Sequence, residues 1–174
     1  MKQVLKTAIV EAVECASTEV RTNLAKSPSE TLNHEALARC AMYMSFRQQG
    51  LPVHVEAAYP KKHQKCDLRV LFGDGDEAWI EVKTAWHVAG WNNKPAEQRD
   101  RCRKDLVKLR HAPQGTSRVF ALFGFFGDEK AGVSGSVFSA IHGLLEKSEQ
   151  IHDSGTQPFQ WGDVRTMRAW AWVV

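Results

Sequence analysis

The sequence predicts an α/β fold, because helix-type and strand-type periodicities follow one another along its 174 residues. Residues 3–25 and about 31–49 repeat apolar positions every three to four residues, which indicates two amphipathic helices. From residue 53 onward the repeat shortens to two, as in strands with one buried face. The composition, with 43% hydrophobic and 25% charged residues, is typical of a globular protein. Length and composition together predict a single domain with a sizeable core.

The remaining elements follow from local sequence. Ser or Thr near 27–31 is expected to cap the second helix, and Gly50-Leu-Pro to end it. The later elements are expected as strands at 53–59, 66–72 and 78–85, a helix at about 96–110, a buried strand at 117–126, a helix starting at Ser134 or Ser136 and running to about 149, and a last strand at roughly 164–174. The predicted order is α-α-β-β-β-α-β-α-β.

Composition also limits the classes of function. The net charge is only +3, so an affinity for nucleic acid has to come from local clusters of basic residues. The four cysteines are widely spaced and include no Cys-x-x-Cys pair, which favours reduced thiols over a zinc site or a disulfide framework. No apolar run has the length of a signal peptide or of a membrane span. We therefore expect a cytoplasmic protein with no membrane partner.

The stretch from Cys66 to Trp86 predicts a β-hairpin whose two rows of side chains differ in character. If residues 73–77 form the loop, the apolar row consists of the pairs Leu68 with Val82 and Val70 with Ile80. The polar row then consists of the pairs Arg69 with Glu81 and Asp67 with Lys83. A shift by one residue would mix the two rows, so the pattern places Asp67, Glu81 and Lys83 on one face.

Two carboxylates and a lysine on one face suit phosphodiester hydrolysis. Diagonal neighbours in such a ladder lie about 7–8 Å apart, close enough for Asp67 and Glu81 to share a metal ion. Hard oxygen ligands suit Mg²⁺ or Mn²⁺, and such an ion acidifies a bound water and neutralises charge on the phosphate. Lys83 is expected to orient or deprotonate the attacking water, or to stabilise the transition state. The backbone carbonyl of Val82 is expected to point along the strand edge toward the same ion.

The spacing of these residues resembles a known family. Asp67, a gap of thirteen residues and then Glu81-Val-Lys83 on an antiparallel hairpin is similar to the motif of the PD-(D/E)XK nuclease superfamily. The resemblance implies a restriction-endonuclease-like core, α-β-β-β-α-β, over about residues 30–126. The first helix and a carboxyl-terminal helix and strand would be extensions of that core. It also implies cleavage of DNA, less often RNA, that depends on Mg²⁺ or Mn²⁺ and leaves a 5′-phosphate.

The resemblance also implies accessory residues. Glu35 matches the glutamate of the first core helix that completes the metal site in many members. Gln98 resembles the glutamine of the RecB-like branch, although Cys102 stands where that branch has tyrosine. Glu56 on the first strand is a further acidic candidate, because its parity opposes that of Val53 and Val55.

Basic residues predict a surface for the phosphate backbone. Between residues 99 and 110 six basic residues outnumber two acidic ones, around an expected buried stripe of Cys102, Leu106 and Leu109. The side chains assigned to nucleic-acid binding are Arg99, Arg101, Arg103, Lys104 and Lys108 of this helix, with Lys61, Lys62 and Arg69 near the hairpin and Trp91 in the following loop. Trp86 and Trp91 either stack on bases or cap the core, and both roles stay open. A homodimer through the first helix is also open.

Two alternatives compete with the nuclease interpretation. The first is that Asp67 with Lys83, and Arg69 with Glu81, are cross-strand ion pairs on a solvated face. The second is a catalytically silent domain of the same fold that binds nucleic acid or a protein partner.

Overall fold

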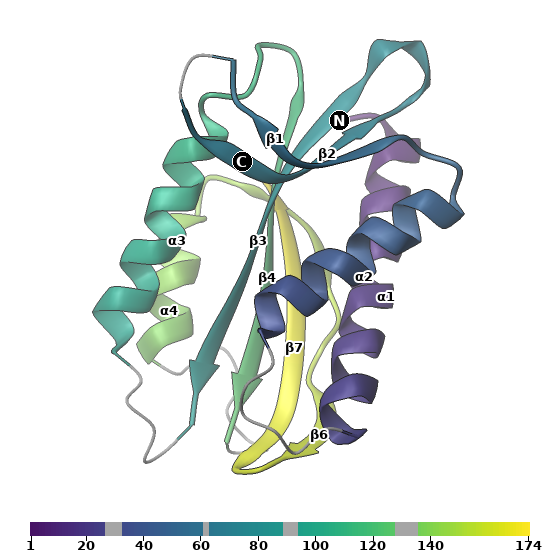
Figure 1. Ribbon diagram of the computed structural model, residues 1–174. Coiled ribbons are helices and arrows are strands. Elements are labelled where there is room, and N and C mark those ends of the chain that lie inside the picture. The colour runs from purple at the N-terminus through teal and green to yellow at the C-terminus, as the bar shows by residue number, and fades with distance from the viewer. Residues whose placement is uncertain (27–32, 61–62, 89–93, 128–135) are drawn as a thin grey trace.

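The computed structural model describes residues 1–26, 33–60, 63–88, 94–127 and 136–174. Over these ranges the chain forms a seven-stranded, mostly antiparallel sheet and four α-helices (Figure 1). The elements are α1 (Gln3–Lys26), α2 (His34–Gln48), β1 (Val53–Ala58), β2 (Lys65–Leu71), a 3₁₀ turn (Gly73–Gly75), β3 (Glu77–His87), α3 (Pro95–Leu109), β4 (Ser117–Phe126), α4 (Ser136–Leu144), β5 (Glu149–Asp153), β6 (Gln157–Trp161) and β7 (Val164–Val173). None of the described helices is long and apolar enough to cross a membrane.

The strands lie in the order β1-β2-β3-β4-β7-β5, and β6 pairs with β7. Only the β3–β4 pair is parallel within the described sheet, as the intervening α3 crossover allows. Figure 1 shows α1 and α2 on one side of the long central strands and α3 and α4 on the other. The molecule therefore has a helix, sheet and helix layer, with a separate apolar cluster on each face of the sheet.

The central strand β4 is apolar throughout because both of its faces are covered. Val119, Ala121 and Phe123 belong to the cluster under α1 and α2. Phe120 and Leu122 belong to the cluster under α3 and α4. The period-two pattern thus divides one strand between two cores.

The neighbouring strand β3 follows the same alternation with a different chemistry. Ile80 and Val82 join the α1/α2 cluster, as their apolar character predicts. Glu81 and Lys83 alternate with them and are paired in register with Phe120 and Leu122 of β4. Two charged side chains are therefore directed into the layer between the sheet and α3.

Most predicted elements agree with the structure to within three residues. The second helix begins at His34, and its cap is Asn33, whose side chain accepts from the Ala36 N–H at 3.1 Å. The Ser and Thr candidates for this cap at 27–31, and Ser134, lie outside the described residues.

The carboxyl-terminal third differs from the prediction. The helix expected to reach about 149 ends at Leu144, and residues 149–153 form β5 instead. Neither β5 nor β6 was predicted. Both contain five residues, too few to establish a clear period, and β6 contains a proline that is unusual in a strand.

The predicted register of the β2–β3 hairpin is wrong by two residues. Leu68 pairs with Ile80 rather than with Val82. The cause lies in the loop, where the Phe72 N–H donates to the Asp76 carbonyl at 2.8 Å, so the turn closes at Asp76, two residues earlier than the expected Ala78. A two-residue shift leaves every side chain on its predicted face, so the apolar pattern cannot distinguish the two registers.

Candidate active site

Glu81 is the most deeply buried acidic group of the predicted site, with 1% of its side chain exposed. The Tyr59 hydroxyl donates to its Oε1 at 2.8 Å, and the Lys108 ammonium donates to its Oε2 at 2.9 Å. Burial, together with the nearby charge of Asp67, raises the pKa of Glu81 to about 8, although Lys108 opposes the change. Glu81 is therefore a carboxyl group held near the point of ionisation at neutral pH.

Asp67 lies where the β2 backbone stops pairing with β3. The last backbone pair is Leu68 with Ile80. Beyond it, the Val82 N–H donates to the side-chain Oδ2 of Asp67 at 2.7 Å instead of to a backbone carbonyl of β2. Its other oxygen accepts from Arg39 of α2 at 3.1 Å. In a strand the N–H and C=O of one residue point to the same edge, so the Val82 carbonyl faces the Asp67 side as well.

Lys83 lies between two carboxylates from different helices. Its Nζ is 3.1 Å from Glu35 Oε1 of α2 and 2.8 Å from Asp105 Oδ2 of α3, and only 11% of its side chain is exposed. Burial alone lowers the pKa of Lys83, but Asp105 and Glu35 outweigh burial and raise it. Lys83 is thus a fixed cation rather than a neutral amine.

Asp105 was not predicted as a site residue, yet its carboxylate contacts both Lys83 and Lys108. Its Oδ1 is 2.7 Å from Lys108 Nζ, and its side chain is 8% exposed. Asp105 is buried on α3 with Cys102 and Leu109, and Leu106 is partly buried against the same cluster, so the predicted stripe holds but omitted Asp105. The signal was present in the i, i+3, i+7 spacing of residues 102, 105 and 109.

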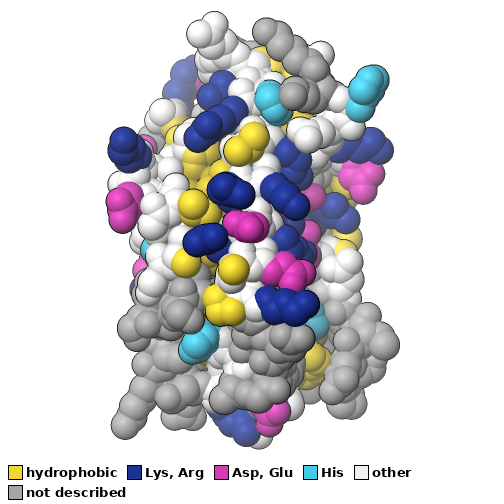
Figure 2. Space-filling view, turned by 90° about the vertical axis from the view of Figure 1, so that its left-hand side faces the viewer, with side chains coloured by type: hydrophobic (Ala, Val, Ile, Leu, Met, Phe, Trp, Pro, Cys, Tyr) yellow, Lys and Arg dark blue, Asp and Glu magenta, His cyan; other side chains and the backbone are white. Residues whose placement is uncertain are grey.

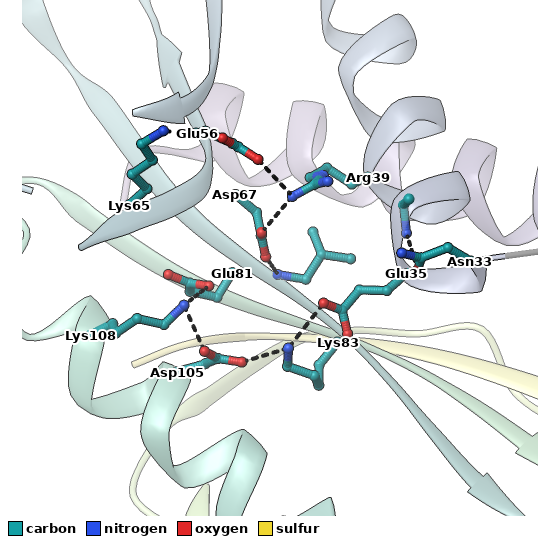
Figure 3. Close-up of polar contacts among 12 residues, drawn as sticks. Asn33, Glu35, Arg39, Glu56, Lys65, Asp67, Glu81, Lys83, Asp105 and Lys108 are labelled. Carbon is teal, nitrogen blue, oxygen red and sulfur yellow. Dashed lines mark hydrogen bonds and ion pairs between the residues drawn. The ribbon is translucent and has the colours of Figure 1, made fainter. Parts of the chain in front are cut away.

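Figure 3 shows Glu35, Asp67, Glu81 and Lys83 in one group of polar side chains between α2, β3 and α3. Lys83, Asp105 and Lys108 link Glu35 to Glu81 through consecutive contacts (Figure 3). Across the described part of the chain, no three His, Cys, Asp or Glu side chains gather closely enough to hold a metal ion in this conformation. The carboxylates are instead neutralised by lysine and arginine side chains.

The cross-strand ion pairs of the first alternative do not form. Glu81 and Lys83 are buried rather than solvated, and their charged partners come from helices. Arg69 donates to Glu77 at 2.7 Å and lies over the Trp79 ring, with 5.2 Å between the guanidinium carbon and the ring centre. The polar row of the hairpin is therefore not a simple solvated ladder.

The two accessory candidates have specific contacts. Glu56 is exposed, adopts a left-handed φ of 51° and forms ion pairs with Lys65 at 3.3 Å and with Arg39 at 4.0 Å. It therefore reaches Asp67 only through the shared arginine. The Gln98 amide group bonds both the N–H and the C=O of Trp86, at 2.8 and 3.2 Å. Gln98 thus fixes the start of α3 to the edge of β3.

Lys and Arg side chains cover the outer face of α3 together with apolar side chains (Figure 2). Arg99 and Arg103 contact Asp100 at 3.5 and 3.7 Å, and Arg101 contacts Glu35 at 3.7 Å. Lys104 is exposed, whereas Lys108 turns inward. This face combines exposed basic residues with one lysine that belongs to the buried network.

Of the two aromatic candidates, Trp86 lies within the described residues and Trp91 does not. Trp86 stacks on Phe125 with 4.1 Å between ring centres, so it packs against the core. Trp91, Lys61 and Lys62 lie outside the described residues.

Sequence reasoning missed three partners of the site: Asp105, Arg39 and Tyr59. Arg39 follows Glu35 by one helical turn, a spacing that places both on one side of α2. Tyr59 follows β1 directly, and nothing in its local sequence indicates a contact with Glu81 twenty-two residues later.

Comparison with known proteins gives no match among family models, curated proteins or solved structures. Any assignment of function therefore depends on the site itself.

Proposed function

We propose that the protein is a metal-dependent nuclease that hydrolyses phosphodiester bonds in DNA, with RNA as the less favoured substrate. The observation that carries the proposal is the buried Glu81 beside Asp67, with a pKa raised to about 8. Two carboxylates held close in a poorly solvated place destabilise a fold, and such arrangements concentrate at functional sites. A divalent cation would relieve their repulsion.

The order of elements supports the proposal. The succession α2-β1-β2-β3-α3-β4 follows the α-β-β-β-α-β order of the restriction-endonuclease-like core that the motif implies. Asp67, Glu81 and Lys83 lie on β2 and β3 of this succession, and Glu35 lies on its first helix. We therefore assign α1 and the segment from α4 to β7 to extensions of that core.

The donor chemistry fits Mg²⁺ or Mn²⁺. Both cations prefer oxygen ligands and retain waters when only one or two carboxylates bind them. Asp67, Glu81 and the Val82 carbonyl would hold the ion, and Glu35 would assist. When bound, the ion supplies an acidified water and neutralises phosphate charge.

The chain's own side chains perform the positioning. Lys83, fixed by Glu35 and Asp105, would donate hydrogen bonds to the attacking water and to the phosphate oxygens, which would orient the water and stabilise developing negative charge. The outer basic side chains of α3 bind the phosphate backbone of the substrate. All four cysteines are free thiols, which is compatible with the cytoplasmic location that we retain in the proposal.

One observation favours a second candidate, the silent nucleic-acid-binding or protein-binding module. Every carboxylate oxygen of Asp67 and Glu81 already accepts a hydrogen bond from Arg39, Val82, Tyr59 or Lys108. A site satisfied in this way needs no metal for stability. This candidate predicts binding without cleavage.

Cleavage assays separate the two candidates. Wild type should cut plasmid or single-stranded DNA with Mg²⁺ and not with EDTA, and Lys83→Ala should lose the activity. Lys6→Ala is the matched control, because Lys6 forms an ion pair with Glu149 on the surface and is remote from the site. Equal cutting by wild type and Lys83→Ala, or none by either, would reject the nuclease assignment.

A further inference from the structure

The Lys108 ammonium lies at a point that two buried carboxylates share. It is 2.9 Å from Glu81 Oε2 and 2.7 Å from Asp105 Oδ1 (Figure 3). The carboxylates come from different elements, β3 and α3, and their side chains are 1% and 8% exposed. Glu81 and Asp105 thus present two carboxylate oxygens to a single point, and the Lys108 ammonium occupies that point.

The other atoms of these carboxylates are directed elsewhere. Glu81 Oε1 accepts from Tyr59, and Asp105 Oδ2 lies 2.8 Å from Lys83 Nζ. One oxygen of each carboxylate is thus left for the Lys108 position. Without a cation there, Glu81 and Asp105 could not both be ionised in this poorly solvated place without strong repulsion.

Lys108 has a path away from this position. Its side chain is 23% exposed, in contrast to the two carboxylates. It lines a surface hollow together with Gln64, Lys104 and His111, so a rotation about its side-chain bonds can move the ammonium into water. Glu81 and Asp105 are held by a strand and a helix and cannot leave in the same way.

We infer that Glu81 and Asp105 form a binding position for a divalent cation, which the Lys108 ammonium fills until Mg²⁺ or Mn²⁺ displaces it. This inference rests on the proposed function. It extends that function, because Asp105 lies outside the motif formed by Asp67 and Glu81-Val-Lys83. Two carboxylates completed by waters are a sufficient ligand set for these ions. Lys108 then competes with the metal ion for the same oxygens.

Calorimetric titration with Mn²⁺ in the absence of nucleic acid tests the competition. Lys108→Met keeps an unbranched side chain only one atom shorter and removes its charge. It should bind Mn²⁺ at least about tenfold more tightly than wild type, because the ion no longer has to displace an ammonium. The double variant Lys108→Met/Asp105→Asn should lose this gain. Lys94→Met is the matched control, since Lys94 pairs with Glu97 on α3 but is exposed, and it should bind like wild type.

Each outcome bears on a separate claim. Equal Mn²⁺ affinity in wild type and Lys108→Met would overturn the competition and leave the nuclease proposal standing. No Mn²⁺ binding by any of the proteins would overturn both. If Lys108→Met unfolds without metal, thermal unfolding replaces calorimetry: Mn²⁺ should raise its midpoint more than that of wild type, and an unchanged midpoint would reject the inference.

Discussion

The β2–β3 hairpin carries a glutamate near each end, and the two glutamates have different surroundings. Glu77, near the loop, is paired within the hairpin by Arg69 and by the indole N–H of Trp79. Glu81, at the far end, is paired by Tyr59 and Lys108, which lie outside the hairpin. The first is a local contact at a partly exposed surface, whereas the second requires the tertiary fold.

The difference separates a charge that the hairpin pairs by itself from a charge that the tertiary fold has to pair. A cross-strand pair such as Arg69 with Glu77 needs only the hairpin, because each side chain neutralises the charge of the other. Glu81 and Lys83 are buried only when α2 and α3 pack against the sheet, and their charges then remain balanced by a connected network. Charge that is buried at some cost is a better indicator of function than charge of the same type at the surface.

The largest expected effect is on the rate of DNA cleavage, which should fall when Glu81 is replaced but not when Glu77 is. Glu81→Gln removes a proposed metal ligand and should reduce cleavage by about a thousandfold or more, a loss of roughly 4 kcal/mol in transition-state stabilisation. Glu77→Gln, the same change at the other end, should retain activity within about threefold. The readout is the rate of Mg²⁺-dependent DNA cleavage at saturating metal. Similar losses in both variants would show that the two ends do not differ.

The next effect concerns stability. Asp105→Asn leaves Lys83 and Lys108 close together with one compensating charge fewer, and should lower the free energy of unfolding by about 2–4 kcal/mol. Asp100→Asn, on the exposed side of α3, should change it by less than about 0.5 kcal/mol. Urea denaturation measures both, and a neutral Asp105→Asn would contradict a strongly coupled network.

A smaller effect is the pH dependence that the raised pKa of Glu81 produces. Between its usual pKa of 4.5 and about 8, folded Glu81 keeps a proton that the unfolded chain releases. The folded state then binds more protons, so this group's contribution to stability is lost as pH rises through that interval. From about pH 5 to about pH 8 wild type should lose roughly 1–3 kcal/mol more than Glu81→Gln.

The matched control for this pH series is Glu77→Gln, which keeps Glu81 and should follow the wild-type slope. Denaturation at several pH values supplies the measurement. Identical slopes in wild type and Glu81→Gln would mean that Glu81 ionises normally in the folded protein.

The smallest effect is expected at the loop end. Arg69→Ala removes the contacts with Glu77 and the Trp79 ring, and should cost about 0.5–1.5 kcal/mol, because the pair is partly exposed. Arg69 is also a predicted contact for nucleic acid, so DNA affinity measured at two salt concentrations is the informative readout. A reduced salt dependence would add a binding role to the structural one.

The sequence was sufficient to predict most elements and the faces of β3, because period and parity are local properties. The strand limits of 117–126 and the inward alternation of Glu81 and Lys83 follow from such patterns. The register of the hairpin was not predictable to better than two residues, since loop closure at Phe72 depends on backbone geometry rather than on hydrophobicity.

The charged partners of the site were harder to predict. On a helical wheel Asp105 shares the face of Cys102 and Leu109, but only packing of α3 against β3 brings Asp105 to Lys83 and Lys108 to Glu81. Arg39 reaches Asp67 across twenty-eight residues of chain. Spacing along the sequence indicates which face of a helix carries Asp105 or Arg39, but which side chains they meet depends on the tertiary arrangement.

The most direct test of the proposed site is a crystal structure grown with Mn²⁺, with anomalous scattering used to locate the ion. The nuclease proposal predicts an anomalous peak bound by Glu81 and Asp67. The further inference predicts a peak bound by Glu81 and Asp105, with the Lys108 ammonium moved out of its present contact. No ion bound by these carboxylates at saturating Mn²⁺ would contradict the nuclease proposal, and an unaltered Glu81–Lys108 pair would contradict the further inference.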